Sequence, residues 1–250
     1  MRAASTDESL QKTLDWALER MKQKGYVVKS KVTLNVEPNL AIMGYARKEG
    51  QVHKIMISEW ALDSEMLGGL VLHELSHVYF AERGAYSHDS AVLEEVLDEL
   101  KERDGLRVKE TDALIDAFNH LQNVLVDDIV FAVMEEKELD NAKSFFSEWV
   151  SNRASGDPVA DASLLSRNAF AIASLKRRNL FDKDSEMYYR NQSLLSALGP
   201  QSEKEFEWME SFLEGAKSDW DSPRFREALE AYFDRILSLM RSSSKLDDLR

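Results

Sequence analysis

The sequence of 250 residues contains no cysteine. This excludes disulfide-stabilised scaffolds and metal sites built on thiolates, because both need that side chain. It also fits a reducing compartment, so we expect a cytoplasmic location. Only four prolines and ten glycines interrupt the chain, which predicts long helices with short connections.

Long apolar runs and a surplus of basic residues are also absent. No stretch of about 18 apolar residues occurs, so no membrane-spanning helix is expected. Residues 1–11 are polar and do not form the apolar segment of a secretory signal. The net charge of −13 argues against nucleic acid or an anionic membrane as the partner, because both attract basic surfaces. The remaining expectation is a soluble globular protein.

The spacing of apolar residues predicts an N-terminal helix, three strands and then only helices. We expect an α+β fold, mainly α, with a small three-stranded sheet packed on the following helix and a helical C-terminal part. A Gly- and Pro-containing linker near 151–161 suggests two domains, 1–155 and 156–250. The expected strands are 27–36, 40–47 and 52–58, and the expected helices are 8–24, 63–84, 90–103, 111–137 and 140–150, followed by three or four more.

The most informative stretch is His73–His77, which reads His-Glu-Leu-Ser-His. Histidines at positions i and i+4 of a helix lie on one face, so both rings can reach one metal ion. Glu74 lies about 100° further round, where its carboxylate can address a metal-bound water without ligating the metal. This HExxH pattern predicts metal-assisted hydrolysis, with one Zn²⁺ as the expected ion.

The HExxH pattern also has other interpretations. Such strings arise by chance in roughly one chain in a hundred of this length. Here the helix is otherwise apolar, and three ionisable side chains inside it are costly unless they are paired or coordinated. A di-iron bundle site needs a second Glu-x-x-His, which the sequence does not contain. A mononuclear iron site of two histidines and one carboxylate remains an alternative.

The third metal ligand must come from elsewhere, because catalytic zinc normally has three protein ligands and an open position. Most of the stretch from Phe118 to Met134, in the helix expected at 111–137, is apolar on every side. A polar stripe crosses it, because Asp116, His120, Asn123 and Asp127 share a sector of roughly 60°. An ionised aspartate there needs a cation or a dense set of hydrogen bonds. We therefore expect Asp127 to be the third ligand, with Asp128 as second choice. His120 and Asn123 would orient the ligands.

His88 is a further candidate, eleven residues beyond His77 in a segment that we expect to be a loop. It could serve as an alternative ligand or donate a hydrogen bond to a developing oxyanion. Acidic pairs in the helix expected at 90–103 have suitable spacing too, but the many charges around them favour a solvated face. Those acidic residues are Glu94, Glu95, Asp98 and Glu99.

Over about residues 27–137 the chain resembles the zincins, the metallopeptidases named for HExxH. The order of a helix, a small sheet, the HExxH helix and a later helix with a carboxylate is similar to the gluzincin branch. Gluzincins carry glutamate as the third ligand, whereas the position favoured here is an aspartate. The chain also resembles an uncharacterised archaeal family in four stretches: His73–His77, Ser87-His88, Asn119–Gln122 and Asp127–Ile129.

The resemblance to zincins implies that His73 and His77 bind zinc and that Glu74 is the general base. It implies a zinc-dependent peptidase acting on a peptide or protein substrate, which could pair in extended form with the sheet edge near 42–47. Two alternatives stay open. The protein could bind metal without proteolytic activity, as a pseudo-enzyme or interaction protein, or it could be another metal-dependent hydrolase.

Overall fold

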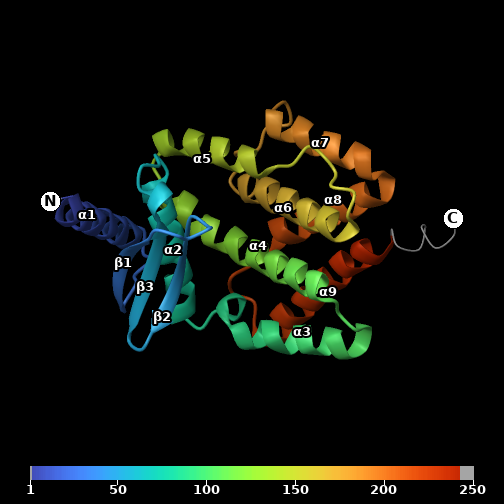
Figure 1. Ribbon diagram of the computed structural model, residues 1–250, viewed down its shortest axis with the longest axis horizontal. Helices are drawn as coiled ribbons and strands as arrows, with labels where there is room; N and C mark the ends of the chain where they lie inside the picture. Colours follow the sequence, from blue (N-terminus) through green and yellow to red (C-terminus); the bar gives the residue numbers. More distant parts are fainter. Residues whose placement is uncertain (1, 243–250) are drawn as a thin grey trace. The chain divides into compact units, whose positions relative to one another are not determined.

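The computed structural model describes residues 2–242 and is mainly helical, with one three-stranded sheet in that range (Figure 1). The expected α+β class, mainly α, is confirmed. Within the same range no helix is long and apolar enough to cross a bilayer. In chain order the elements are α1 (Arg2–Gln23), β1 (Lys31–Glu37), β2 (Gly44–Glu49), β3 (Val52–Ser58), η1 (Glu59–Ala61), α2 (Leu67–Glu82), η2 (Tyr86–His88), α3 (Ser90–Asp104), α4 (Val108–Val133), α5 (Glu136–Trp149), α6 (Pro158–Lys176), α7 (Glu186–Leu198), α8 (Pro200–Gly215) and α9 (Ser222–Ser242).

The chain forms two compact units. The first contains the chain up to His88 together with Val126–Ala142, and the second contains Asp89–Leu125 and the chain from Lys143 onward. This division differs from the boundary expected after residue 155. That expectation followed the change in composition at the linker, whereas the units follow contacts between distant segments. The long helix α4 contributes to both units.

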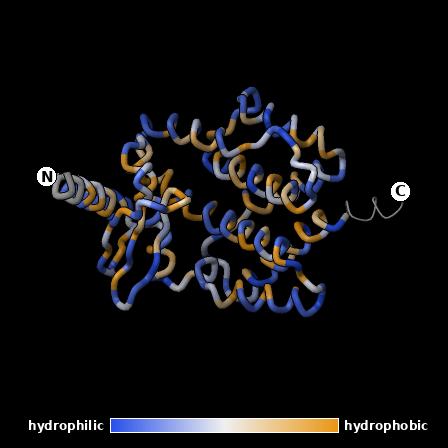
Figure 2. Tube along the Cα trace, viewed as in Figure 1, coloured by the Kyte–Doolittle hydropathy of each residue, from blue (hydrophilic) through white to orange (hydrophobic). Residues whose placement is uncertain are grey.

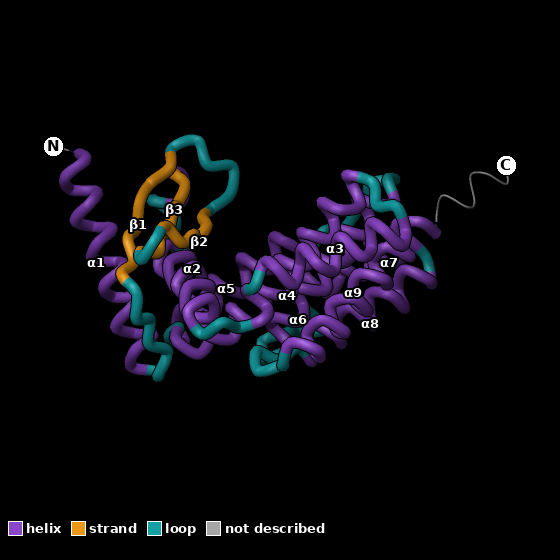
Figure 3. The backbone as a smooth tube through the Cα atoms, turned by 90° about the horizontal axis from the view of Figure 1, so that it is seen from below, coloured by secondary structure: helices purple, strands orange, loops and turns teal. Residues whose placement is uncertain are grey.

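The sheet belongs to the first unit and has the strand order β1-β3-β2 (Figure 3). The central strand β3 pairs in parallel with β1 and antiparallel with β2. Residues of β3 alternate in burial, with Ile55 and Ile57 fully buried. β2 and β3 form a hairpin that turns at Gly50, whose φ is +60°. In Figure 2 this turn is hydrophilic, while β3 carries hydrophobic residues.

Several element starts differ from those that the sequence predicts, and two of them, those of β2 and α2, lie next to the histidine motif or the strand that contacts it. The strand expected at 40–47 begins only at Gly44, because the chain turns after β1, where the Leu40 amide donates to the Glu37 carbonyl at 3.2 Å. The HExxH helix begins at Leu67 rather than near Ser64. Ser64 instead accepts a hydrogen bond from the Met66 amide at 3.1 Å, in the turn that precedes α2. Ser64 is a good N-cap residue, but it stabilises the turn before α2, and the N-cap position of α2 is Met66.

Two adjacent glycines of α2 receive side chains from other segments, Trp16 of α1 and Met134, the residue after α4. A Cβ at Gly68 would lie 3.0 Å from the Trp16 ring, and a Cβ at Gly69 would lie 2.8 Å from Cε of Met134. Gly68→Ala is expected to lower the free energy of unfolding by about 1–2 kcal/mol, because a packed indole cannot yield easily. Gly69→Ala is expected to be nearly neutral, since a methionine end can move and alanine favours the helix by about 1 kcal/mol.

Urea unfolding of both glycine variants beside the parent protein checks this contrast. Each variant adds the same methyl group at adjacent positions of one helix, so each is the matched control for the other. Equal losses of stability in the two variants would show that contact with the Trp16 ring is not the cause of the loss in Gly68→Ala.

Candidate metal centre

The two histidines of the HExxH motif face each other on α2. Their Nε2 atoms are 3.2 Å apart, and the ring planes meet at 70°. Two nitrogen ligands that each lie about 2.0–2.1 Å from a tetrahedral Zn²⁺ are separated by about 3.3–3.4 Å. The Nε2 atoms of His73 and His77 are therefore spaced as two ligands of one such ion would be.

Asp127 of α4 holds the other side of the His73 ring. Its Oδ1 lies 3.2 Å from Nδ1 of His73, and the aspartate side chain is buried. The carboxylate accepts the Nδ1 proton, which leaves the lone pair of His73 on Nε2, toward His77. Since the two ring nitrogens point in nearly opposite directions, this oxygen is beyond bonding distance of an ion held by both Nε2 atoms. Asp127 thus contacts the Nδ1 side of the His73 ring, which differs from its predicted place as the third ligand.

His88 holds the His77 ring in the same way. Its Nε2 is 2.9 Å from Nδ1 of His77, its Nδ1 is 2.9 Å from the Ser87 hydroxyl, and its ring stacks on Phe80. Burial, reinforced by the charge of His73, lowers the pKa of His88 to about 4. A neutral His88 can accept the Nδ1 proton of His77. His88 therefore contacts the Nδ1 side of the His77 ring, away from Nε2, whereas the sequence predicted it as a ligand or an oxyanion donor.

Glu74 is 5 % exposed and reaches from α2 to the sheet. Its carboxylate accepts a hydrogen bond from the backbone amide of Ala46 in β2, and burial raises the pKa of Glu74 from its ordinary value. A buried carboxylate with a raised pKa is suited to accept a proton near neutral pH. Glu74 lies close enough to His73 to feel its charge, but it takes no part in the hydrogen bond between the two histidines.

His120 has different surroundings from those expected, all within the second unit. Its Nδ1 is 2.9 Å from the Ser166 hydroxyl, which is itself 2.9 Å from the Tyr232 hydroxyl, and its ring stacks on Phe170. Burial, with the charge of Arg167 as a smaller cause, lowers the pKa of His120 to about 3. His120 is a neutral member of a buried polar chain and does not orient the motif histidines.

The remaining candidates on α4 are Asn123 and Asp128, and both are half-buried. Within residues 2–242, no three or more histidine, aspartate or glutamate side chains are gathered as a metal-binding group. The structure therefore brings together two nitrogen donors, their two Nδ1 partners and a buried glutamate. It does not gather the predicted set of three ligands.

Comparison with known proteins places the chain in a family. Residues 18–229 match a protein family of unknown function, DUF5781. The chain belongs to DUF5781. The matched stretch contains the complete sheet, the histidine pair with its partners, and α2 to α8. No curated protein and no solved structure matches the sequence.

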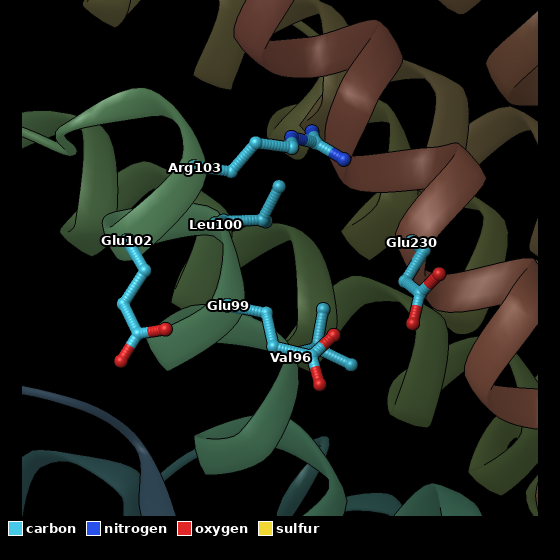
Figure 4. A pocket seen from close by; sticks show the side chains of 6 residues that line it. All are labelled: Val96, Glu99, Leu100, Glu102, Arg103 and Glu230. Atoms are coloured by element: carbon cyan, nitrogen blue, oxygen red, sulfur yellow. The ribbon is translucent and has the colours of Figure 1, made fainter.

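The second unit of this DUF5781 protein also contains a cleft of about 390 Å³ (Figure 4). Its rim is acidic, but Arg226 contacts three of the nearby carboxylates, those of Glu95, Glu99 and Glu230. The cleft has no histidine in its lining, so it is distinct from the histidine pair of α2. The lining residues are Val96, Glu99, Leu100, Glu102 and Arg103 of α3 and Glu230 of α9.

Proposed function

We propose that this protein is a zinc-dependent hydrolase of the zincin type that cleaves peptide bonds. The observation that carries the proposal is the pair of Nε2 atoms 3.2 Å apart, each ring being held at Nδ1 by a separate partner. Such partners fix the tautomer of a ligating histidine and make its free nitrogen a better donor. The donor set fits zinc, which favours neutral imidazole nitrogen.

In the proposed reaction, the motif residues and the groups that contact them each have a role. His73 and His77 would hold the ion, which when bound polarises a carbonyl group and makes water more acidic. Glu74 accepts the proton of the attacking water and passes it to the leaving amine. The Ala46 amide fixes the direction of the Glu74 carboxylate through its hydrogen bond. Asp127 and His88 hold the orientation of the His73 and His77 rings through their contacts with Nδ1.

The edge strand β2 supports an extended peptide as the substrate. The Ser58 amide donates to the Met43 carbonyl at 2.9 Å, which makes Met43 a residue that hydrogen-bonds to β3. In an antiparallel pair such residues alternate with residues whose N–H and C=O groups point away from the partner strand. In β2 the latter are Gly44, Ala46 and Lys48. Ala46 is one of these residues, and its amide contacts Glu74. A peptide added to this edge would therefore lie along the strand that contacts the proposed base.

A second candidate is a metal-binding protein without peptidase activity. It is favoured by the absence, among residues 2–242, of a gathered group of three ligands. Elemental analysis of the purified protein and cleavage of a fluorogenic peptide library, with and without chelator, separate the two. One zinc per chain with chelator-sensitive cleavage supports the peptidase, and zinc without cleavage favours the second candidate. A metal-free protein that cannot be loaded contradicts both, and bound iron would favour an iron enzyme.

The role of Asp127 yields a separate prediction. Asp127→Ala is expected to weaken zinc binding about 10–100-fold, as loss of a histidine partner does. Asp127→Asn is expected to weaken it less, because the amide oxygen can still accept the Nδ1 proton of His73. Titration against a chromophoric chelator measures both affinities, with His77→Ala as the reference for loss of a direct ligand. If Asp127→Asn lost as much affinity as His77→Ala, Asp127 would be a ligand after all.

A further inference from the structure

Two arginines of the second unit lie beside a buried hydrogen bond that joins α6 to α7. The Nδ2 atom of Asn168 donates to Oδ1 of Asn191 at 3.0 Å, and both asparagines are almost completely buried. Arg167 directly precedes the first asparagine and Arg190 directly precedes the second. The asparagine pair thus fixes the backbone positions from which the two guanidinium groups extend.

Neither guanidinium has a strong anionic partner in the structure. Arg167 donates from Nη2 to the Ser151 hydroxyl at 2.6 Å, and no carboxylate of residues 2–242 lies within ion-pair distance of it. Arg190 has Glu186 at 3.9 Å, but that glutamate side chain is 81 % exposed, so the pair contributes little. The Nε atoms of both arginines are buried and have no hydrogen-bond partner in the structure.

This is unusual in a chain with 45 acidic and 32 basic residues other than histidine, where carboxylates are plentiful. Other half-buried arginines of the second unit show the contrast: Arg226 contacts three glutamates, and Arg241 makes two hydrogen bonds to Glu110. Burial, together with the positive charge of Arg190, lowers the pKa of Arg167. Half-buried like charges with unsatisfied donors are costly unless an anion joins them.

The segment after α5 completes a frame around Arg167. The Ser151 amide donates to Oδ1 of Asn168 at 2.9 Å, and Nδ2 of Asn168 donates to the Ser151 carbonyl at 3.0 Å. Two hydrogen bonds therefore hold the backbone of Ser151, whose hydroxyl accepts from Arg167 and keeps its own proton available for donation. These hydrogen bonds tie the segment after α5 to α6, and the asparagine pair ties α6 to α7. The Ser151 hydroxyl and the two guanidinium groups are the hydrogen-bond donors on these three segments.

We propose that Arg167 and Arg190, with the Ser151 hydroxyl, form a binding site for an oxyanion, a phosphate or carboxylate group. Guanidinium groups present paired N–H donors that match either group, and such charge-assisted bonds are about twice as strong as neutral ones. The site is made only of residues of the second unit. It is independent of the proposed hydrolase activity, because it shares no residue with the histidine pair or Glu74.

Isothermal titration of the full chain with inorganic phosphate, and separately with acetate, tests the proposal against a chloride reference of equal ionic strength. We expect saturable binding of at least one anion, weakened at least tenfold in Arg167→Gln and in Arg190→Gln. Arg226→Gln is the matched control, because its charge is already met by glutamates, and it should bind like the parent. Saturation by phosphate alone identifies a phosphate group as the ligand, whereas saturation by acetate identifies a carboxylate.

Absence of saturable binding for both anions would overturn the proposal, and so would undiminished affinity in the two variants. The test compares the anion affinity of the parent with that of the two glutamine variants. An anion bound elsewhere on the protein would bind all three equally, so it would not produce the expected difference. Should Arg167→Gln fail to fold through loss of its bond to Ser151, Arg190→Gln alone decides. Its side chain is 30 % exposed and its nearest carboxylate is 3.9 Å away.

Discussion

Glu74→Gln is expected to reduce kcat/KM for peptide hydrolysis by roughly 10²–10⁴-fold while zinc content stays at the level of the parent protein. Glutamine has the size of glutamate, and its amide oxygen can still accept the hydrogen bond from Ala46. It cannot take up the proton of the attacking water. The histidine pair and its Nδ1 partners are untouched by the change, so metal binding and folding should persist. Steady-state cleavage and elemental analysis of the same sample measure both quantities.

Glu82→Gln is the matched control for this experiment, because Glu82 is the last residue of the same helix. Its carboxylate accepts from the amides of Lys29 and Ser30 at 2.8 and 2.7 Å, a structural role away from the motif. This variant should keep its activity and lose only some stability. If Glu74→Gln retained both zinc and full activity, the assignment of Glu74 as the base would be wrong.

The sequence predicts the histidine pair well because its geometry is local. Positions i and i+4 of one helix fix how His73 and His77 meet, and no knowledge of the rest of the fold is needed. The roles of Asp127 and His88 depend instead on which edge of each ring faces a neighbouring segment. Burial of charge predicts Asp127 as the third ligand, but periodicity cannot distinguish a contact at Nδ1 of a histidine from a contact with a bound metal ion.

The polar stripe of α4 shows why a shared helix face is a weak guide to shared surroundings. His120 and Asp127 lie within a narrow sector, yet seven residues separate them by about 10 Å along the helix axis. That distance takes them into different units, His120 to the second and Asp127 to the first. Each unit is made of segments far apart in sequence. Composition along the chain therefore does not predict that α4 passes from the second unit to the first between Leu125 and Val126.

Glu110→Gln is expected to cause a large loss of stability, about 2–3 kcal/mol at neutral pH. The Glu110 side chain is fully buried and accepts two hydrogen bonds from Arg241 at 3.0 Å, one from the Arg107 side chain and one from the Arg107 amide, both at 2.8 Å. Glutamine removes the negative charge and turns an amide donor toward cations. Partial exposure of both arginines keeps the loss below that of a fully buried pair.

The same carboxylate should make stability fall at acid pH. Hydrogen bonds from Arg241, and then those from Arg107, hold the pKa of Glu110 well below its ordinary value of 4.5. Because the folded state lowers this pKa, the stabilisation is fully present above about pH 4.5 and is lost as the pH falls through the folded value. Urea unfolding from pH 7 to pH 3 should show a steeper decline in the parent than in Glu110→Gln. Glu186→Gln, at a carboxylate that is 81 % exposed, should match the parent throughout. Equal slopes in the parent and Glu110→Gln would mean that other carboxylates govern the acid response.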